Sequence, residues 1–499
     1  MMLASIIRRE FLSNILTARF AIGLIVYLAL MVVCTYISIE DYEERLAGNN
    51  SAVKEHRAIL EEQVQVYSEL VNTWPLGGIK VDMRPSPLSI LSQGIIDKVN
   101  NTLSFGFALA PTINSGQRQS NTNPLMKAFT SIDIAIVFQI VMSLLAILFT
   151  YDSISGERED GILALIMSNS ISRGKLLAGK YIGGMLTLLA ISLPSFLVCL
   201  IMMHLSSSIS LSADEWLRLG IFFLSSIAYI SAFFLIGVFI SSVTRSSATS
   251  LMIALLFWTF VVILYPSITV FAVDQLMTES IPDRGVNHGE YWREYEAEKD
   301  RYLDSLGLGS ETRWSSRITL GITGTKGGSY GGSYTRLHQP EPKSAVPAVC
   351  KRFGYLEPLR VQYADKVWQE AENHKFRRKL TRERLARNLL QASPAGAYYN
   401  TTAAISGTDA GGYEAFFSQV QQYRREVIQY AYDNELFSSP GWFVVEEKKD
   451  LSSFPVFRNR SETTAESLHR SADSIMILIA LNAIFFMASH ISFLKGDLK

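Results

Sequence analysis

The chain has 499 residues, 48% of them hydrophobic and 18% charged, and its formal net charge is zero. The apolar residues are gathered into long uncharged runs, which excludes a single water-soluble domain of this length. The zero net charge says little by itself, because the information lies in which side of a membrane each charge occupies.

The first 14 residues predict a short amphipathic helix that lies on the inner membrane surface. Its apolar face has Leu3, Ile6, Ile7 and Phe11, and its charged face has Arg8, Arg9 and Glu10. The alternative is a simple extension of the first span into the cytoplasm. No cleavage site of small residues follows the first apolar run, so we expect an uncleaved anchor and not a secretory signal.

Six apolar runs are each about as long as the ~20 residues that a helix needs to cross a ~30 Å hydrocarbon layer. The predicted spans occupy residues 15–39, 132–151, 180–204, 218–244, 246–273 and 473–494. We therefore expect an α-helical membrane protein with six transmembrane helices, an N-terminal amphipathic helix, and a mainly helical extracytoplasmic domain formed by two insertions.

The Lys and Arg residues in short connections predict the orientation of the spans. Basic residues precede the first span, lie between the second and third, join the fourth to the fifth, and follow the sixth. The loop at residues 205–215 has neither Lys nor Arg. Both termini, and the loop at residues 152–179, are therefore expected in the cytoplasm.

Two large segments fall on the outer side, at residues 40–131 and 274–472. Apolar residues at helical spacing predict helices in both, and continuous helices can carry force from the adjoining spans. The second segment contains a glycine-rich repeat at 327–334, interpreted as a flexible connector, and a basic run at 375–387, interpreted as a solvated helix face. An acidic ligand or lipid headgroups are the alternative for the basic run, and nucleic acid is not expected.

The sequence gives little support for catalysis or metal binding by this chain. The three cysteines and seven histidines lack the spacing of a metal site, and no nucleophile motif is present. Residues 174–180 match the G-x-x-x-x-G-K of a phosphate loop, but Tyr181 replaces the residue that would hold magnesium and no strand precedes the match. The span interiors also lack the ionisable groups of ion-coupled carriers. We expect no enzyme activity, no bound cofactor and no metal, and an energy source outside the chain.

The loop at residues 152–179 is the most informative segment. Acidic residues beginning at Glu157 precede the apolar stretch 162–167, and basic residues beginning at Arg173 follow it. This order of charges complements a helix dipole, and a short helix with one apolar side can bind in a groove on a partner. The alternative is that the carboxylates only cap the helix and contact water.

This loop resembles the connection between the second and third spans of ABC-2 type exporter permeases. That family joins these spans by a G-E-x-E-x-G-T motif, a short apolar coupling helix and an S-x-P-x-S-R…G-K motif. The matching residues are Gly156, Glu157, Glu159, Gly161, Ser168, Ser172, Arg173, Gly179 and Lys180. Ile162 stands where Thr is usual and Ser170 where Pro is usual, which leaves the local turn geometry open. The large insertion before the last span is similar to that of permeases implicated in maturation of copper enzymes.

The resemblance implies a permease subunit of an ATP-driven exporter in the bacterial cytoplasmic (inner) membrane. A separate cytoplasmic ABC ATPase would bind ATP and magnesium, and a second permease, identical or different, would complete the pathway. The residues implied in coupling to the ATPase are Glu157, Glu159, Gly161, Leu163, Ile166, Met167 and Arg173. Membrane lipid and a periplasmic partner are the other expected contacts. The alternatives are a mechanotransmitter or scaffold that passes ATP-driven movement to a periplasmic partner, and a transmembrane sensor.

Overall fold

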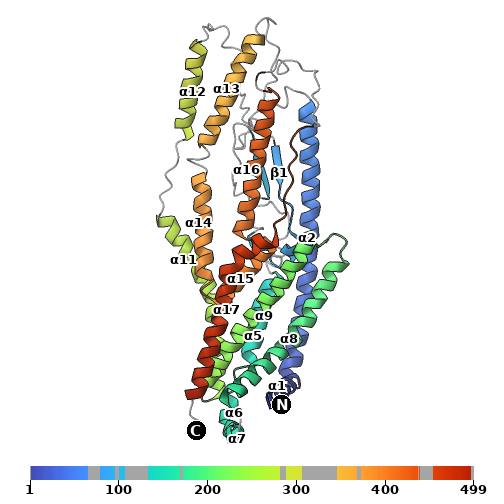
Figure 1. Cartoon of the computed structure of the whole chain (residues 1–499), viewed down its shortest axis with the longest axis vertical. Helices are drawn as coiled ribbons and strands as arrows, with labels where there is room; N and C mark the ends of the chain where they lie inside the picture. The colour runs from blue at the N-terminus through green and yellow to red at the C-terminus, as the bar shows by residue number, and fades with distance from the viewer. Residues whose placement is uncertain are drawn as a thin grey trace, which may run out of the picture.

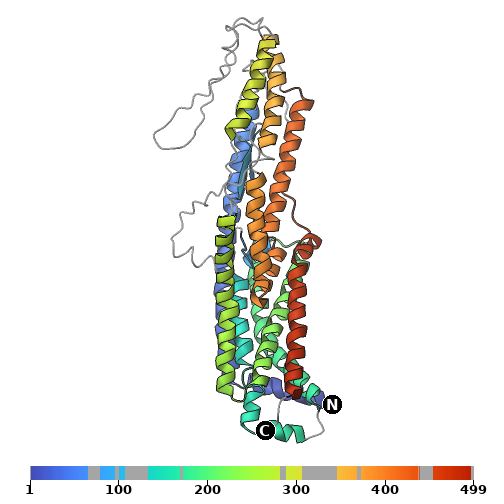
Figure 2. The ribbon, with the colours of Figure 1, turned by 90° about the vertical axis from the view of Figure 1, so that its left-hand side faces the viewer.

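The structure is a computed structural model of the chain and describes residues 2–65, 79–95, 101–106, 133–168, 172–280, 288–305, 346–367, 373–436, 438 and 453–495. It is elongated, with a helical bundle at one end and a second group of helices at the other (Figure 1). Both termini lie at the bundle end, which we call the terminal end (Figures 1 and 2). The second group is built from the two predicted insertions, and we call it the distal domain.

Five helical segments among the described residues are long and apolar enough to cross a membrane. They are α2 (Ala18–Gln65), α8 (Arg173–Leu205), α9 (Ala213–Val243), the continuous run of α10 (Ser247–Trp258), η4 (Thr259–Leu264) and α11 (Tyr265–Ser280), and α17 (Thr464–Lys495). A further apolar helix, α5 (Ile134–Leu148), has 15 residues, fewer than a straight span needs. The predicted helical membrane fold is confirmed, whereas the number of six spans stays a prediction.

The start of α9 is determined by hydrogen bonding. The helix begins at Ala213, before the predicted span at 218–244, whose bounds stay a prediction. The Ser212 hydroxyl accepts from the Glu215 N–H, and the Glu215 carboxylate accepts from the Ser212 N–H at 2.6 Å. This reciprocal capping box satisfies backbone donors that would otherwise be unpaired at a helix start, so the polar first turn is helical as well.

The central helix of the bundle is α9, which contacts α5, α8, α10, α15 and α17. Tyr229, Phe233 and Ile236 are fully or almost fully buried along its middle, as expected for a helix that is apolar on all sides. The Asn482 amide of α17 donates to the Ala228 carbonyl of α9 at 2.9 Å. An uncharged polar group thus joins two span helices, a role that asparagine commonly has in membrane helices.

A short helix of the second insertion, α15 (Pro394–Ser406), packs into the bundle against α9 and α17. Tyr398 is fully buried there, stacks on Tyr229 with ring centroids 4.6 Å apart, and shares a 2.9 Å hydrogen bond with the Ser226 hydroxyl. The helix was not predicted. Its termini carry recognisable signals nonetheless, with Pro394 at the first turn and Gly407 in the left-handed conformation at the end.

The distal domain is mainly helical, as predicted. Its helices are the upper part of α2 together with α12 (His288–Ser305), α13 (Val346–Val367), α14 (Asn373–Leu390) and α16 (Ala410–Asp433). The helix α2 enters it from the bundle without a break (Figure 1). In the basic run, Arg382 pairs with Asp274 and Arg384 pairs with Glu414 at 3.0 Å.

One small sheet in the distal domain was not predicted. The strands β1 (Ile79–Asp82) and β2 (Thr102–Phe105) are antiparallel, with Ile79 opposite Phe105. Phe105 meets Tyr423 of α16 edge-on, with centroids 5.5 Å apart. Strands of four residues are too short to show a clear alternation in the sequence. The glycine-rich repeat at 327–334 lies outside the described residues.

Candidate functional site

The loop between α5 and α8 protrudes from the terminal end of the bundle (Figures 1 and 2). It forms two short helices, α6 (Ser155–Glu159) and α7 (Ile162–Ser168), where one apolar helix was expected. Gly161 lies between them with φ of 71°, a conformation that favours glycine because it has no Cβ. The two helices therefore have separate directions, and each makes its own contacts.

A buried ion-pair cluster joins α6 to α8 and to the N-terminal helix α1 (Met2–Ile15). Lys180 Nζ lies 2.8 Å from Glu10 Oε1 and 2.8 Å from Glu157 Oε1, and Lys180 is only 4% exposed. The approach of α1 depends on Gly183, since a Cβ there would lie 2.7 Å from the Glu10 Cβ. Such a charge cluster at a membrane boundary is costly unless each charge is paired, so it fixes α1, α6 and α8 together.

The loop also binds the end of α9. The Arg158 guanidinium donates to the Thr244 carbonyl at 2.9 Å and to the Ser242 carbonyl at 3.2 Å. The Ser241 hydroxyl accepts from the backbone N–H groups of Ile154 and Ser155, each at 3.0 Å. A cation on the last carbonyls of a helix is favourable to its dipole, so α6 is held against the end of the central helix.

Two further arginines extend these contacts to α2 and α17. Arg19 of α2 pairs with Asp152 at 2.8 Å and donates to the Tyr151 hydroxyl at 2.8 Å. Arg173, at the first position of α8, donates to the Phe493 and Leu494 carbonyls in the last turn of α17. Arg173 was among the predicted site residues, and the structure gives it contacts within the chain.

Glu159 caps the start of α10. Its carboxylate accepts from the Ser247 N–H at 3.0 Å and from the Ser247 hydroxyl at 2.9 Å. These two hydrogen bonds lower the pKa of Glu159 although the side chain is exposed to solvent. With this contact, α6 and its flanking residues contact α1, α2, α8, α9 and α10. We call the residues that make these contacts the loop network: Glu10, Asp152, Glu157, Arg158, Glu159 and Lys180.

The α6 to α10 contact is expected to depend on pH. Because the folded-state pKa of Glu159 is lowered, its contribution is complete above the unfolded value of about 4.3 and is lost as the pH falls through the folded value. Hydrogen exchange should give a lower protection factor for the Ser247 amide below the folded pKa of Glu159 than at pH 6. In Glu159→Gln the protection should be low at both pH values. Equal protection in both proteins across the range would contradict the capping role.

The apolar side chains of α7 divide between the bundle and the solvent. Leu163 is 2% exposed and packs in the core of the bundle, and Ile166 is partly buried against it. Leu165 is 70% exposed, and Ile162 is exposed as well. The Met167 side chain lies outside the described residues. Among the described side chains of α7, the exposed apolar ones are therefore those of Ile162 and Leu165, two residues that were not singled out from the sequence.

The structure thus brings the predicted residues Glu157, Glu159, Gly161 and Arg173 into one region, but with partners inside the chain. The pairing of Lys180 with Glu10 was not foreseen, because the two residues are 170 positions apart. One signal was available. A lysine at the entrance to a span needs a counter-charge, and the N-terminal helix offers Glu10 on its charged face.

The chain is similar to known proteins over most of its length. A family model described as "ABC-2 family transporter protein" matches residues 4–498. The chain is similar to the "Probable ABC transporter permease protein NosY" of Stutzerimonas stutzeri, at 31% identity over 125 residues, and to the protein of the same description from Pseudomonas aeruginosa, at 43% over 56 residues. These matches cover 25% and 11% of this chain, and 44% and 20% of the two relatives.

Proposed function

The chain belongs to the ABC-2 transporter family, and from that premise we propose that it is the permease subunit of an ATP-driven exporter whose ATPase is a separate protein. The family and the helical membrane fold make it a multi-pass transporter permease. We further propose that ATP hydrolysis by the partner supplies the energy and that the cargo moves outward across the membrane. The proposal also assigns the terminal end to the cytoplasm, because the basic residues of the short connections gather there.

The observation that carries this proposal is the loop network at the protruding loop. The loop is joined by ion pairs and hydrogen bonds to α1, α2, α8, α9 and α10, and Arg173 adds α17. A partner that displaces the loop therefore displaces the ends of these helices together, because packed interiors transmit small movements and do not absorb them. This is the arrangement that an external ATPase requires of a permease.

In this proposal α7 is the part that docks on the ATPase. Ile162 and Leu165 supply the exposed apolar contact, with Ile166 and Met167 on the same helix, while Leu163 holds α7 on the bundle. The predicted polar residues Glu157, Glu159 and Arg173 transmit the movement through their contacts inside the chain. Gly161 permits the turn that separates the docking helix from the transmitting one.

A second chain is also part of the proposal. ABC-2 membership implies two permease chains around one pathway, and the exposed apolar faces of the span helices offer surface for such a chain.

A second candidate function, transmission of movement to a partner on the outer side, is favoured by two observations. The helix α2 runs unbroken from the bundle into the distal domain, and α15 fills the top of the bundle with buried side chains such as Tyr398. Reconstituted vesicles separate the two functions. Passage of a solute that depends on ATP supports export, and ATP-dependent movement of the distal domain without passage supports transmission.

The docking helix is tested by Leu165→Asp in the complex purified from native membranes. Burying one leucine is worth about 1.5–3 kcal/mol, so loss of that contact should reduce co-purification of the ATPase at least about tenfold. The matched control is Val456→Asp, which changes a similarly exposed residue in the distal domain and should leave the ATPase bound. Full retention of the ATPase by Leu165→Asp would refute docking on α7, and absence of any ATPase from the native complex would refute the proposed function.

A further inference from the structure

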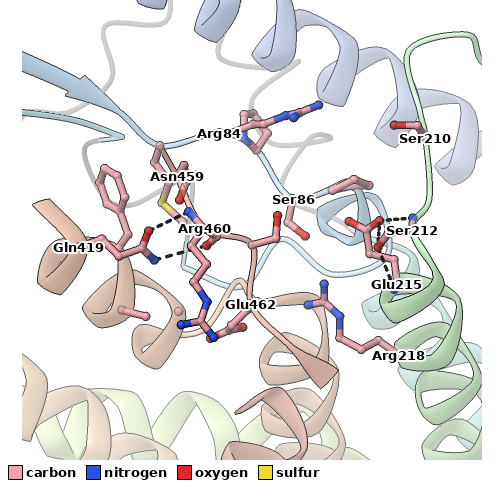
Figure 3. A pocket seen from close by; sticks show the side chains of 18 residues that line it. Arg84, Ser86, Ser210, Ser212, Glu215, Arg218, Gln419, Asn459, Arg460 and Glu462 are labelled. Atoms are coloured by element: carbon pink, nitrogen blue, oxygen red, sulfur yellow. Dashed lines mark hydrogen bonds between the residues drawn. The ribbon is translucent and has the colours of Figure 1, made fainter. Parts of the chain in front are cut away.

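A cavity of about 290 Å³ lies where the bundle meets the distal domain. Its walls come from the residues after β1, the first turns of α9, the corner between α15 and α16, and the segment before α17 (Figure 3). Three arginines line it, Arg84, Arg218 and Arg460, each from a different part of the chain. Four serines, Ser86, Ser210, Ser212 and Ser461, also line it.

Arg218 is the decisive residue of this cavity. It is 3% exposed, and its Nε has no hydrogen-bond partner in the part of the chain that the structure describes. Its Nη1 donates to the Ile405 carbonyl at 3.4 Å, which is long for a hydrogen bond. Among the described residues no carboxylate lies within ion-pair distance of it. A buried guanidinium without a counter-charge is costly, so Arg218 points to a partner that the described residues do not supply.

The acidic residues of the same walls have other partners. The Glu215 carboxylate accepts from the Ser212 N–H at 2.6 Å and from its hydroxyl at 2.8 Å. Glu462 is bound by two nitrogens of Arg470, one of them at 2.7 Å. Figure 3 shows Arg218 directed into the space between these two groups. Glu215 thus caps α9 and Glu462 pairs with Arg470, so neither carboxylate forms an ion pair with Arg218.

We propose that this cavity binds a phosphate-type oxyanion, with Arg218 at its base and Arg84 and Arg460 at its rim. A planar guanidinium with free donors matches the oxygens of a phosphate, and the serine hydroxyls offer further donors. The cavity adjoins the first turns of α9, where Trp216 is 47% exposed, as expected for an aromatic residue at the edge of a membrane. A lipid headgroup and free phosphate share the chemistry that this site recognises. The proposal does not depend on the identity of the ATPase or the cargo.

The test uses full-length protein stripped of lipid in detergent and measures the melting temperature with added probes. The probes are inorganic phosphate, phosphatidylglycerol and, as a neutral comparison, phosphatidylcholine. A ligand at about 100 times its Kd should raise the melting temperature by about 2–3 °C for a chain of this size. A rise with phosphatidylglycerol alone identifies a lipid, and a rise with inorganic phosphate identifies the free ion. No rise with either would overturn the proposal.

Two variants make the assignment to this cavity specific. Arg218→Met should lose the response, while the control Arg425→Met, at an exposed arginine of the distal domain, should keep it. Ser86→Asp places a carboxylate on the cavity wall at the N-cap position of the short helix η2 (Pro87–Ile90), where the serine side chain makes no capping hydrogen bond and aspartate is a preferred residue. It should keep the wild-type melting temperature or raise it, and abolish the response. A full response in either Arg218→Met or Ser86→Asp would overturn the proposal.

Discussion

Replacing Lys180 with methionine is expected to reduce the stability of the protein by about 3–5 kcal/mol, the usual cost of removing one partner from a buried ion pair. Methionine retains the length and apolar stem of the lysine, so the change isolates the charge. The loss leaves Glu10 and Glu157 facing each other in a site where Lys180 is almost fully buried. Thermal unfolding in detergent measures the effect.

The matched control is Lys175→Met, five residues earlier in α8, where the side chain is exposed. It should change stability by no more than about 0.5 kcal/mol. The double variant Glu10→Gln with Lys180→Met should recover part of the loss, because it removes one of the two uncompensated carboxylates. If Lys180→Met and Lys175→Met unfold alike, the cluster does not hold α1 and α6 to α8.

Replacing Arg470 with methionine is expected to cost about 3 kcal/mol, because two acids lose their shared cation. Arg470 binds Glu462 through two nitrogens and lies 3.2 Å from Asp409, which caps α16. It also donates to the Ala404 carbonyl of α15 at 3.3 Å. The arginine thus attaches α17 to the corner between α15 and α16.

Thermal unfolding gives the size of this loss, and hydrogen exchange gives its location. Protection should fall at the start of α16, where the amide of Gly412 donates to Asp409. Arg384→Met is the control, since it removes an exposed pair with Glu414 that should be worth less than about 1 kcal/mol. Unchanged protection at the start of α16 would mean that the corner is held by packing alone.

The sequence predicted the parts of the fold that depend on local pattern. Long apolar runs predicted the span helices, one apolar and one charged face predicted a helix in the first 14 residues, and helical spacing predicted helices in both insertions. The short strands β1 and β2 were missed because four residues carry too little pattern. The helix α15 was missed because its composition is mixed, and its burial comes from contacts with α9 and α17 that no local signal shows.

The candidate site was predicted as a segment but not as a set of contacts. The order of charges located the loop at 152–179 and its two glutamates. Which side of α7 faces the bundle depends on the turn at Gly161 and on the position of α6, so Leu163 and Leu165 cannot be told apart from their spacing. The partners Glu10 and Ser247 are far away in sequence, and only the folded chain brings them to Glu157 and Glu159.

The unbroken α2 has a mechanical consequence. Its 48 residues make a rod of about 72 Å at 1.5 Å per residue. If the terminal end is the pivot, a tilt of about 5° carries the far end through about 6 Å, roughly one helical turn. Arg19 is attached to the loop network close to that pivot. A small displacement of α2 near Arg19 would therefore move its far end, in the distal domain, by several ångströms, because α2 acts as a rigid lever.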